Sequence, residues 1–368
     1  MSVLYKVLGV ILALVAIAVL SLALVLSHDS PCGPAPPLAS NATTTKAIMQ
    51  RCYGPPETLR LEDIEKPAPK DNEILVKVHA ASVNPLDWHF MRGQPYIMRA
   101  EAGFGAPKVA RLGVDFAGTV EAIGKNVKRF KPGDEIFGAK RGAFGEYVSV
   151  PDDRPMALKP PNLTFEQAAA VPVAAVTALQ ALRDQGKIQP GQKVLINGAS
   201  GGVGTFAVQI AKALGAEVTG VCSTGNVAMV QSLGADHVID YKKVDYTQGA
   251  LRYDVIVDNV GNRSLLENRH VLTPKGIFVI VGGPNDGKFL GALWSPIKAW
   301  LLSPFVGQKF GFFLADVTQA DLDFLNELMQ SGKVRPVIDR SYKLSEVPAA
   351  IAYLEAGHAR GKVVITVE

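Results

Sequence analysis

A strand, a glycine-rich turn and a helix follow one another in the middle of the chain, and this unit restricts the fold more than any other feature. Lys193 to Asn197 is a short apolar run, and the turn after it reads Gly198-Ala199-Ser200-Gly201-Gly202-Val203-Gly204. Apolar side chains then recur at helical spacing up to Leu214. Small residues let such a turn approach a phosphate at the positive end of the helix dipole. The unit predicts a dinucleotide site, although Ala199 stands where the common form has its first glycine; a purely structural tight turn is the alternative.

The same alternation continues along the chain. Further strands are expected at Glu217 to Cys222, His237 to Asp240, Tyr253 to Asn259 and Gly276 to Val281, with helices at Val227 to Leu233 and Ser264 to Leu272. This order predicts an α/β fold with a parallel, doubly wound sheet. Short β-type runs from Ile48 to Ile136 predict a barrel-like β domain before it. A helix at Leu322 to Met329 and a strand at Lys362 to Val367 could return to that first domain.

The form of the cofactor depends on the turn after the second strand. NAD-binding proteins place an acidic residue there, on the ribose 2′-hydroxyl. No acidic residue occurs from Val218 to Leu233, and the turn reads Cys222-Ser223-Thr224-Gly225-Asn226. Hydroxyl and amide donors without a carboxylate favour the 2′-phosphate of NADP. The alternative is that these polar side chains cap the next helix.

The amino-terminal part of the chain has a different character. Val7 to Leu26 is an uncharged run of 20 residues in which only Gly9 and Ser21 are not aliphatic. At about 1.5 Å per residue it would span roughly 30 Å, the thickness of a bilayer core. We expect residues 1–27 to form a single membrane anchor, with a cleaved signal peptide or a buried helix as alternatives. Residues 28–45 are rich in proline and predict an extended linker.

Charge and cysteine content exclude several classes of protein. The chain has 38 basic and 34 acidic residues, a formal net charge of +4 and no dense basic run, so we expect no nucleic-acid partner. The three cysteines, Cys32, Cys52 and Cys222, lie far apart. We therefore expect no disulfide framework, and a four-cysteine structural zinc site is excluded by count.

From residue 46 to 368 the sequence resembles the zinc-independent quinone oxidoreductase branch of the medium-chain dehydrogenase/reductase superfamily. The resemblance rests on segments in a shared order: Val76 to Trp88, Gly113-Val114-Asp115-Phe116-Ala117-Gly118, Pro132-Gly133-Asp134, Gly145-Glu146-Tyr147, Val171-Pro172, Gly198 to Gly204 and Ser232 to Asp236. It implies a GroES-like β-barrel domain formed by residues 46–171 and 320–368, and a Rossmann domain formed by residues 172–319.

The resemblance also bears on the reaction. Asn84 stands where the zinc alcohol dehydrogenases of the superfamily have a catalytic cysteine, and Gly113-Val114-Asp115 stands where they have Gly-His-Glu, so two zinc ligands are missing. The family transfers hydride from NADPH to quinones or α,β-unsaturated carbonyls without zinc, and we expect the same small-molecule substrates here. The alternatives are a non-catalytic NADP-binding partner protein at a membrane, and an alcohol dehydrogenase-like activity with weak metal use.

Individual site residues are carried over from the family. Asn84 would face nicotinamide and substrate, unless it only forms a turn before Pro85. Asp87 holds a position usual in the family, or it only braces the next segment. His89 is the nearest plausible proton donor, or it is structural. Tyr53 lines the pocket, or it packs in the core. The expected cofactor contacts are Thr177, Gly198, Ser200, Gly201, Gly202, Val203, Ser223, Thr224, Tyr241, Asn259, Val281 and Gly282. Many NADPH-using relatives have Arg or Lys where this chain has Gly225, so NAD use remains possible.

Two further expectations concern surfaces. Phe289 to Ala315 is unusually apolar but interrupted by Lys298 and Lys309, and the family implies a cleft lid there and an edge for a homodimer. A second span and contact with a bilayer surface are the alternatives. Lys6 on one side of the apolar run and Asp29 on the other weakly place the body outside the cytoplasm, whereas the use of NADPH favours the cytoplasmic side.

Overall fold

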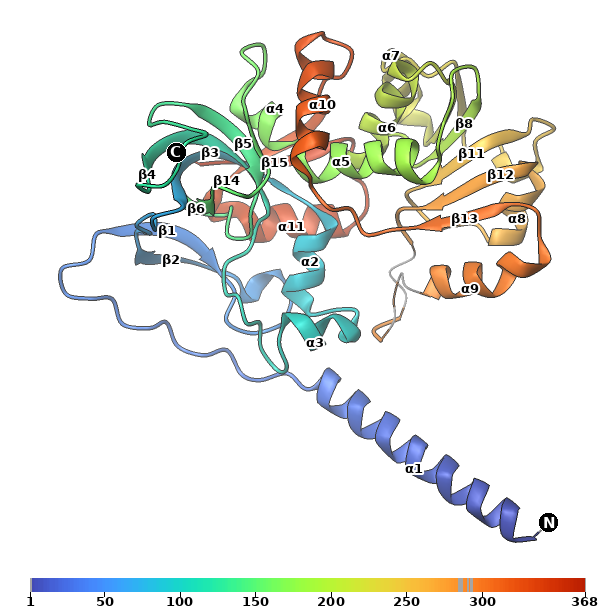
Figure 1. Ribbon diagram of the computed structural model, residues 1–368, viewed down its shortest axis with the longest axis horizontal. Helices are drawn as coiled ribbons and strands as arrows, with labels where there is room; N and C mark the ends of the chain where they lie inside the picture. The colour runs from blue at the N-terminus through green and yellow to red at the C-terminus, as the bar shows by residue number, and fades with distance from the viewer. Residues whose placement is uncertain (1, 284–286, 290, 292–293, 368) are drawn as a thin grey trace.

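The computed structural model describes residues 2–283, 287–289, 291 and 294–367 of the chain. Its body consists of two domains, each built on one β-sheet, and a long helix projects from it (Figure 1). The predicted α/β architecture of a barrel-like domain joined to a doubly wound domain is confirmed.

The first domain is formed by the early part of the chain and its carboxyl end. Its sheet has the order β14-β15-β3-β4-β5-β7, with β6 paired to β3. The strands are β3 (Glu73–Val83), β4 (Asp115–Ile123), β5 (Glu135–Ala139), β6 (Tyr147–Pro151), β7 (Met156–Leu158), β14 (Ile338–Lys343) and β15 (Lys362–Thr366), and β1 (Thr44–Met49) pairs with β2 (Arg60–Glu65) beside them. Helices α2 (Pro85–Arg92), α3 (Arg99–Ala102), α4 (Phe165–Ala169) and α11 (Val347–Glu355) belong to the same part of the body. The strand expected near the carboxyl end does return, because β15 pairs antiparallel with β3.

The second domain has a six-stranded sheet in the order β10-β9-β8-β11-β12-β13, with every pair parallel. Its strands are β8 (Lys193–Asn197), β9 (Glu217–Cys222), β10 (His237–Asp240), β11 (Tyr253–Asp258), β12 (Leu272–Ile280) and β13 (Lys309–Phe312). Its helices are α5 (Pro172–Gln180), α6 (Gly202–Ala213), α7 (Val227–Ser232), α8 (Leu265–His270) and α9 (Trp294–Leu302), and α10 (Gln319–Gln330) packs against both α5 and β7. The strand order reverses between β9 and β11 on either side of β8, and ligands of such sheets bind at the carboxyl ends of the strands at this point.

One hydrophobic core joins the two domains. Ala80 of β3 and Phe137 of β5 belong to the same buried cluster as Ile196 of β8 and Leu325 of α10. The strands contribute every second side chain to this cluster, and the helices contribute one apolar face each. The two domains therefore share one continuous packed core.

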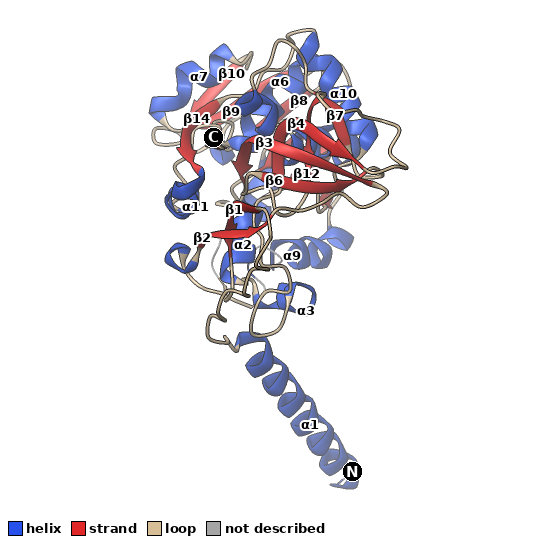
Figure 2. Cartoon of the chain, turned by 90° about the vertical axis from the view of Figure 1, so that its left-hand side faces the viewer, coloured by secondary structure: helices blue, strands red, loops and turns tan. Residues whose placement is uncertain are grey.

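The amino-terminal helix α1 (Ser2–Ser27) leaves the body below α3 in both views (Figures 1 and 2). Its segment Tyr5–Ser27 is long and apolar enough to cross a membrane, and its most apolar window is not buried in the body. The alternative of a buried helix is therefore wrong. The expected homodimer edge, β13, lies at one end of the parallel sheet, and the dimer stays a prediction.

The residues after α1 lie on the body. Ser30 N donates to Gly105 O (2.9 Å), and Cys32 forms a disulfide with Cys52, 20 residues further along the chain. We expected no disulfide framework because the cysteines lie far apart in the sequence, and that reasoning missed this single disulfide. Sequence separation does not exclude pairing, because a loop of this length costs little extra entropy to close once both ends are docked. Cys222 is free and buried.

Candidate active site

The glycine-rich turn lies at the carboxyl end of β8 and leads directly into α6. Gly198 has φ of +78°, and a side chain on Gly204 would lie 2.1 Å from Gly198 O. Gly201 is the N-cap residue of α6 and provides no side-chain cap, so no side chain covers the first helical amides there. Ser200 and Val203 are half-buried beside them. These features fit the pyrophosphate of a dinucleotide, which needs a close backbone approach and free amides.

The turn after β9 contains the residues expected near the adenosine ribose. Ser223 and Asn226 are joined to the glycine-rich turn, because Asn226 Nδ2 donates to Ser223 Oγ (3.2 Å) and to Ser200 Oγ (3.1 Å). Thr224 Oγ1 donates to Asp240 Oδ2 (2.7 Å), and this hydrogen bond lowers the pKa of the Asp240 carboxyl. Asp240 ends β10, the neighbouring strand. A carboxylate therefore lies next to this turn, although it comes from β10 and not from the strand that precedes the turn.

A cation from the other domain approaches the same turn. The guanidinium Nη2 of Arg360 lies 3.8 Å from the position that a Cβ on Gly225 would take. Arg360 is exposed and immediately precedes the segment that enters β15. Tyr241 follows Asp240 and is also exposed. Arg360 thus lies close to Gly225, where many NADPH-using relatives have a cation. The contact was not predictable from local sequence patterns, because 135 positions separate the two residues.

The carboxyl ends of β11 and β12 form the edge expected to face nicotinamide. Asn259 Nδ2 donates to Asn197 O (2.9 Å), whereas Asn259 Oδ1 is buried and has no hydrogen-bond partner among the described residues. A side chain on Gly282 would lie 2.2 Å from Asn259 O, and Val281 N donates to Asp258 O (3.0 Å). A buried acceptor without a hydrogen-bond partner destabilises the folded protein, and a ligand N–H or O–H at this edge would supply the missing hydrogen bond. The residues present therefore fit a nicotinamide dinucleotide.

Thr177, the remaining expected cofactor contact, lies on α5. Its Oγ1 donates to Val173 O (2.7 Å), four residues earlier in the same helix. This is the self-bonding geometry that a helical threonine adopts without a ligand. The side chain is half-buried, and its contact with the cofactor stays a prediction.

Asn84 lies in a buried polar network between the domains. Its Oδ1 accepts from Lys362 Nζ (2.6 Å), and its Nδ2 donates to Asp115 Oδ2 (2.9 Å). Asn84 is 2% exposed and Lys362 3%. Both polar ends of the Asn84 amide are therefore engaged with protein groups, so the amide positions Lys362 and Asp115 relative to each other.

Lys362 connects this network to the glycine-rich turn. Its ammonium also lies 3.7 Å from Asp115 Oδ2, and its Cδ lies 3.2 Å from the Cβ position of Gly202. Burial lowers the pKa of Lys362 and raises that of Asp115. Mutual attraction opposes both shifts, as expected for an ion pair removed from water. Lys362 and Asp115 were not among the expected site residues.

Asp87 lies beside this network at the start of α2. Its Oδ2 accepts from Asn84 N (2.8 Å), while its Oδ1 is buried and has no partner among the described residues. The hydrogen bond fits a bracing role, and a role of Asp87 in the reaction stays a prediction. Burial raises the pKa of Asp87 to about 7. The carboxyl therefore changes its protonation near neutral pH, which is uncommon for an aspartate.

His89 lies on α2, and Tyr53 packs against Gly93 at the end of the same helix. His89 Nδ1 lies 2.7 Å from Gln94 O, which can only accept, so Nδ1 carries the proton and Nε2 presents its lone pair. Burial lowers the pKa of His89, so the neutral ring is favoured. Tyr53 is buried, its hydroxyl donates to Gly103 O (2.9 Å), and the Arg99 guanidinium lies 4.3 Å from its ring centre. This geometry is that of a core residue.

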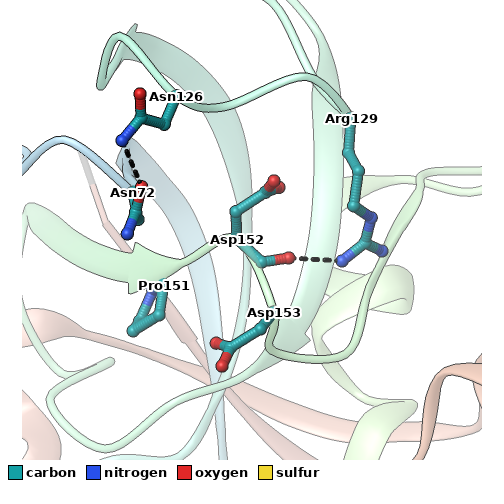
Figure 3. A pocket seen from close by; sticks show the side chains of 6 residues that line it. All are labelled: Asn72, Asn126, Arg129, Pro151, Asp152 and Asp153. Carbon is teal, nitrogen blue, oxygen red and sulfur yellow. Dashed lines mark hydrogen bonds between the residues drawn. The ribbon is translucent and has the colours of Figure 1, made fainter.

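Two cavities accompany these residues. One, of about 510 Å³, lies on the rim of the first domain and is lined by Asn72, Asn126, Arg129, Pro151, Asp152 and Asp153 (Figure 3), none of which is an expected site residue. The other, of about 560 Å³, lies between α8 and α9 and reaches Asp258 and Gly282 at the nicotinamide edge. Within the described part of the chain no three His, Cys, Asp or Glu side chains are grouped to hold a metal ion.

Known proteins share both the domains and their order. Residues 70–161 match the alcohol dehydrogenase GroES-like domain, and residues 233–365 match the family described as zinc-binding dehydrogenase. The chain is 37% identical to mouse "NAD(P)H oxidoreductase RTN4IP1, mitochondrial", over 91% of this chain and 93% of that protein. It is 33% identical to "2-methylene-furan-3-one reductase" of Solanum lycopersicum, over 87% and 78% respectively.

Among solved structures, a quinone oxidoreductase from Coxiella burnetii superposes with a TM-score of 0.77 at 31% identity, over 89% of this chain and 100% of that one. The chain belongs to the zinc-independent quinone oxidoreductase-like branch of the medium-chain dehydrogenase/reductase superfamily. It is accordingly an oxidoreductase. Its NAD(P)H oxidoreductase relatives support a nicotinamide cofactor, and the contacts of that cofactor with the glycine-rich turn and with Asn259 stay predictions.

Proposed function

We propose that this protein reduces quinones or α,β-unsaturated carbonyls with NADPH and without a metal ion. The observation that carries the proposal is the contact of the buried Asn84 network with the glycine-rich turn through Lys362. This contact joins a buried positive charge to the cofactor site. Relatives named for quinone and 2-methylene-furan-3-one reduction support the acceptor class.

The protein groups then have distinct roles. When bound, the cofactor supplies a hydride to an electron-poor carbon of the acceptor, and negative charge develops on the acceptor's oxygen. Lys362, held by Asn84 and Asp115, provides a positive potential near this charge. His89 accepts a hydrogen bond at Nε2 and so orients a water molecule, and this water supplies the proton that completes the reduction.

We further propose that NADPH is preferred and that NADH is also used. Arg360 provides a cation for the 2′-phosphate close to Gly225, which favours NADPH. Asp240, bonded to Thr224, offers a carboxylate to a ribose hydroxyl, which permits NADH. Lys243, 3.7 Å from Asp240, reduces the repulsion that this carboxylate would exert on a phosphate.

The test is oxidation of NADPH, followed by absorbance, with a panel of quinones and enones. We expect turnover with at least one acceptor and a decrease in kcat of about tenfold or more in Asn84→Ala, because the variant leaves the buried Lys362 ammonium with one partner fewer. NADPH binding without turnover of any acceptor would favour a non-catalytic partner protein instead. Zinc in elemental analysis of the active protein would favour an alcohol dehydrogenase-like enzyme.

We also propose that α1 stays attached and anchors the body in a membrane, as a single span. Carbonate extraction of membranes together with the intact mass of the full chain tests this. Extraction of the protein, or a mass that lacks the first 27 residues, would show a cleaved signal peptide instead.

A further inference from the structure

The carboxyl end of α1 is fixed to the first domain by a buried arginine. Arg99 Nη1 donates to Leu26 O and to His28 O (3.0 Å each), and its Nη2 lies 2.8 Å from a carboxylate oxygen of Asp29. The Arg99 side chain is 1% exposed, and its Nε donates to Gly93 O (2.8 Å). The body therefore keeps one face toward any bilayer that α1 crosses, because charge-assisted bonds and the disulfide at Cys32 hold the exit of the helix.

The second domain exposes an apolar surface on this side of the body. Ala299 of α9 packs into the core, while Trp294, Ile297, Trp300 and Leu301 point outward, and Phe305 follows in the 3₁₀ turn η7 (Ser303–Phe305). We call these five exposed residues the α9 patch. Trp300 is 75% exposed and Phe305 82%. Both views place α9 and α3 on the side of the body from which α1 departs (Figures 1 and 2).

The charge around the α9 patch matches an anionic lipid surface. Lys288, Lys298 and Lys309 are exposed around it, and the sequence contains no Asp or Glu from Gly287 to Ala315. Tryptophan prefers the boundary between headgroups and acyl chains, and lysines near it bind anionic headgroups. Residues 290, 292 and 293 of this stretch lie outside the described residues.

Helix α9 also borders the proposed active site, because Ser295 and Lys298 line the cavity that reaches Asp258 and Gly282. Tyr96 N donates to Lys288 O (2.7 Å), and the rings of Tyr96 and Phe289 meet edge to face with centres 5.2 Å apart. Tyr96 lies two residues after Gln94, the partner of His89. Lys288 and Phe289, which precede α9, therefore pack on the loop that follows α2.

We propose that the α9 patch rests on the surface of the bilayer that α1 crosses, and that the acceptor enters the site from the lipid phase. The acceptor would be a quinone or enone with an apolar tail; this part rests on the proposed function, whereas the contact with lipid does not. We favour the bilayer over a second copy of the chain as the partner of the α9 patch. The contacts of Arg99 with Leu26, His28 and Asp29 fix the exit of α1 on the side of the body where the patch lies.

Quenching of tryptophan emission tests the contact without any reaction. The chain has three tryptophans, two in the α9 patch and a buried one, Trp88. We expect the larger part of the emission of the full chain to be quenched in vesicles of phosphatidylcholine and phosphatidylglycerol with brominated acyl chains. In Trp294→Phe/Trp300→Phe the remaining emission should be insensitive to bromine. Unquenched wild-type emission would overturn the proposal. Emission that changes with protein concentration but not with brominated lipid would show that the α9 patch binds a second copy of the chain instead.

Kinetics test the route of the acceptor. For Trp300→Lys/Phe305→Lys we expect about a tenfold higher KM for a long-chain quinone dissolved in vesicles, because the variant loses interfacial aromatic anchors. The KM for a short, water-soluble quinone should not change. Leu251→Lys changes an exposed apolar residue outside the patch and serves as the control. Equal KM changes for both quinones would refute entry from lipid. If no quinone were turned over, the proposed function would fail while the quenching result still decided the lipid contact.

Discussion

Arg360→Gln is the most direct test of how the protein recognises NADPH. Arg360 is the guanidinium closest to Gly225, at 3.8 Å from its Cβ position, and it is exposed. A hydrogen bond between charged groups contributes roughly 1.5–3 kcal/mol when shielded from water, and exposure reduces this to about 1–2 kcal/mol. We therefore expect the Kd for NADPH to rise about 5- to 30-fold. The Kd for NADH should change by less than about twofold at physiological salt, because the remaining long-range attraction is screened.

The assay is a fluorescence titration of the full chain with each reduced cofactor, which does not depend on an acceptor. Arg252→Gln is the matched control, because Arg252 is exposed just before the amino end of β11, at the opposite edge of the sheet from the cofactor. A second variant, Arg360→Gln with Gly225→Lys, should recover NADPH binding, since Gly225 has ordinary backbone angles and only Arg360 lies within 4 Å of its Cβ position. Equal losses of NADPH and NADH in Arg360→Gln would refute a contact with the 2′-phosphate.

Three other changes have outcomes that the structure fixes. The pKa of Asp87 is raised to about 7, so the folded protein holds this proton more tightly than the unfolded chain. The free energy of unfolding should therefore fall by up to about 1.4 kcal/mol per pH unit as the pH rises from 4 to 7. In urea titrations, Asp87→Asn should remove this pH dependence. Lys362→Met leaves the Asp115 carboxylate buried without its cation and should lower the unfolding free energy by about 3–5 kcal/mol, whereas an unchanged urea midpoint would disprove the buried ion pair. Cys32→Ser opens the loop closed at Cys52 and should lower the unfolding free energy by about 3 kcal/mol, with no further effect of a reductant.

The parts of the site that were predictable from the sequence are those that depend on neighbours in the chain. The glycine-rich turn, its strand and its helix occupy consecutive residues, so the pattern alone locates Gly198 and Gly202 at the end of β8. The turn after β9 contains no acidic residue, but Asp240 reaches Thr224 from the next strand. Local patterns carry no information on such contacts between strands.

The contacts that were missed join residues far apart in the chain. Asn84 was expected to offer its amide to a substrate, and the pairing of β15 with β3 instead brings Lys362 to its carbonyl oxygen. The same return of the chain brings Arg360 to Gly225. Tertiary packing decides these contacts, and a single sequence gives residue types without their partners.

The disulfide after α1 also bears on the compartment in which the body resides. Disulfides persist in oxidising compartments, whereas glutathione and thioredoxin keep cytosolic thiols reduced. On the cytosolic side, Cys32 and Cys52 would react with an alkylating reagent added to freshly lysed cells, and hydrogen bonds such as those of Arg99 would hold the exit of α1 without a covalent link. On the opposite side both would resist alkylation until a reductant is added. The oxidation state of Cys32 in cells therefore reports which side of the membrane carries the catalytic body.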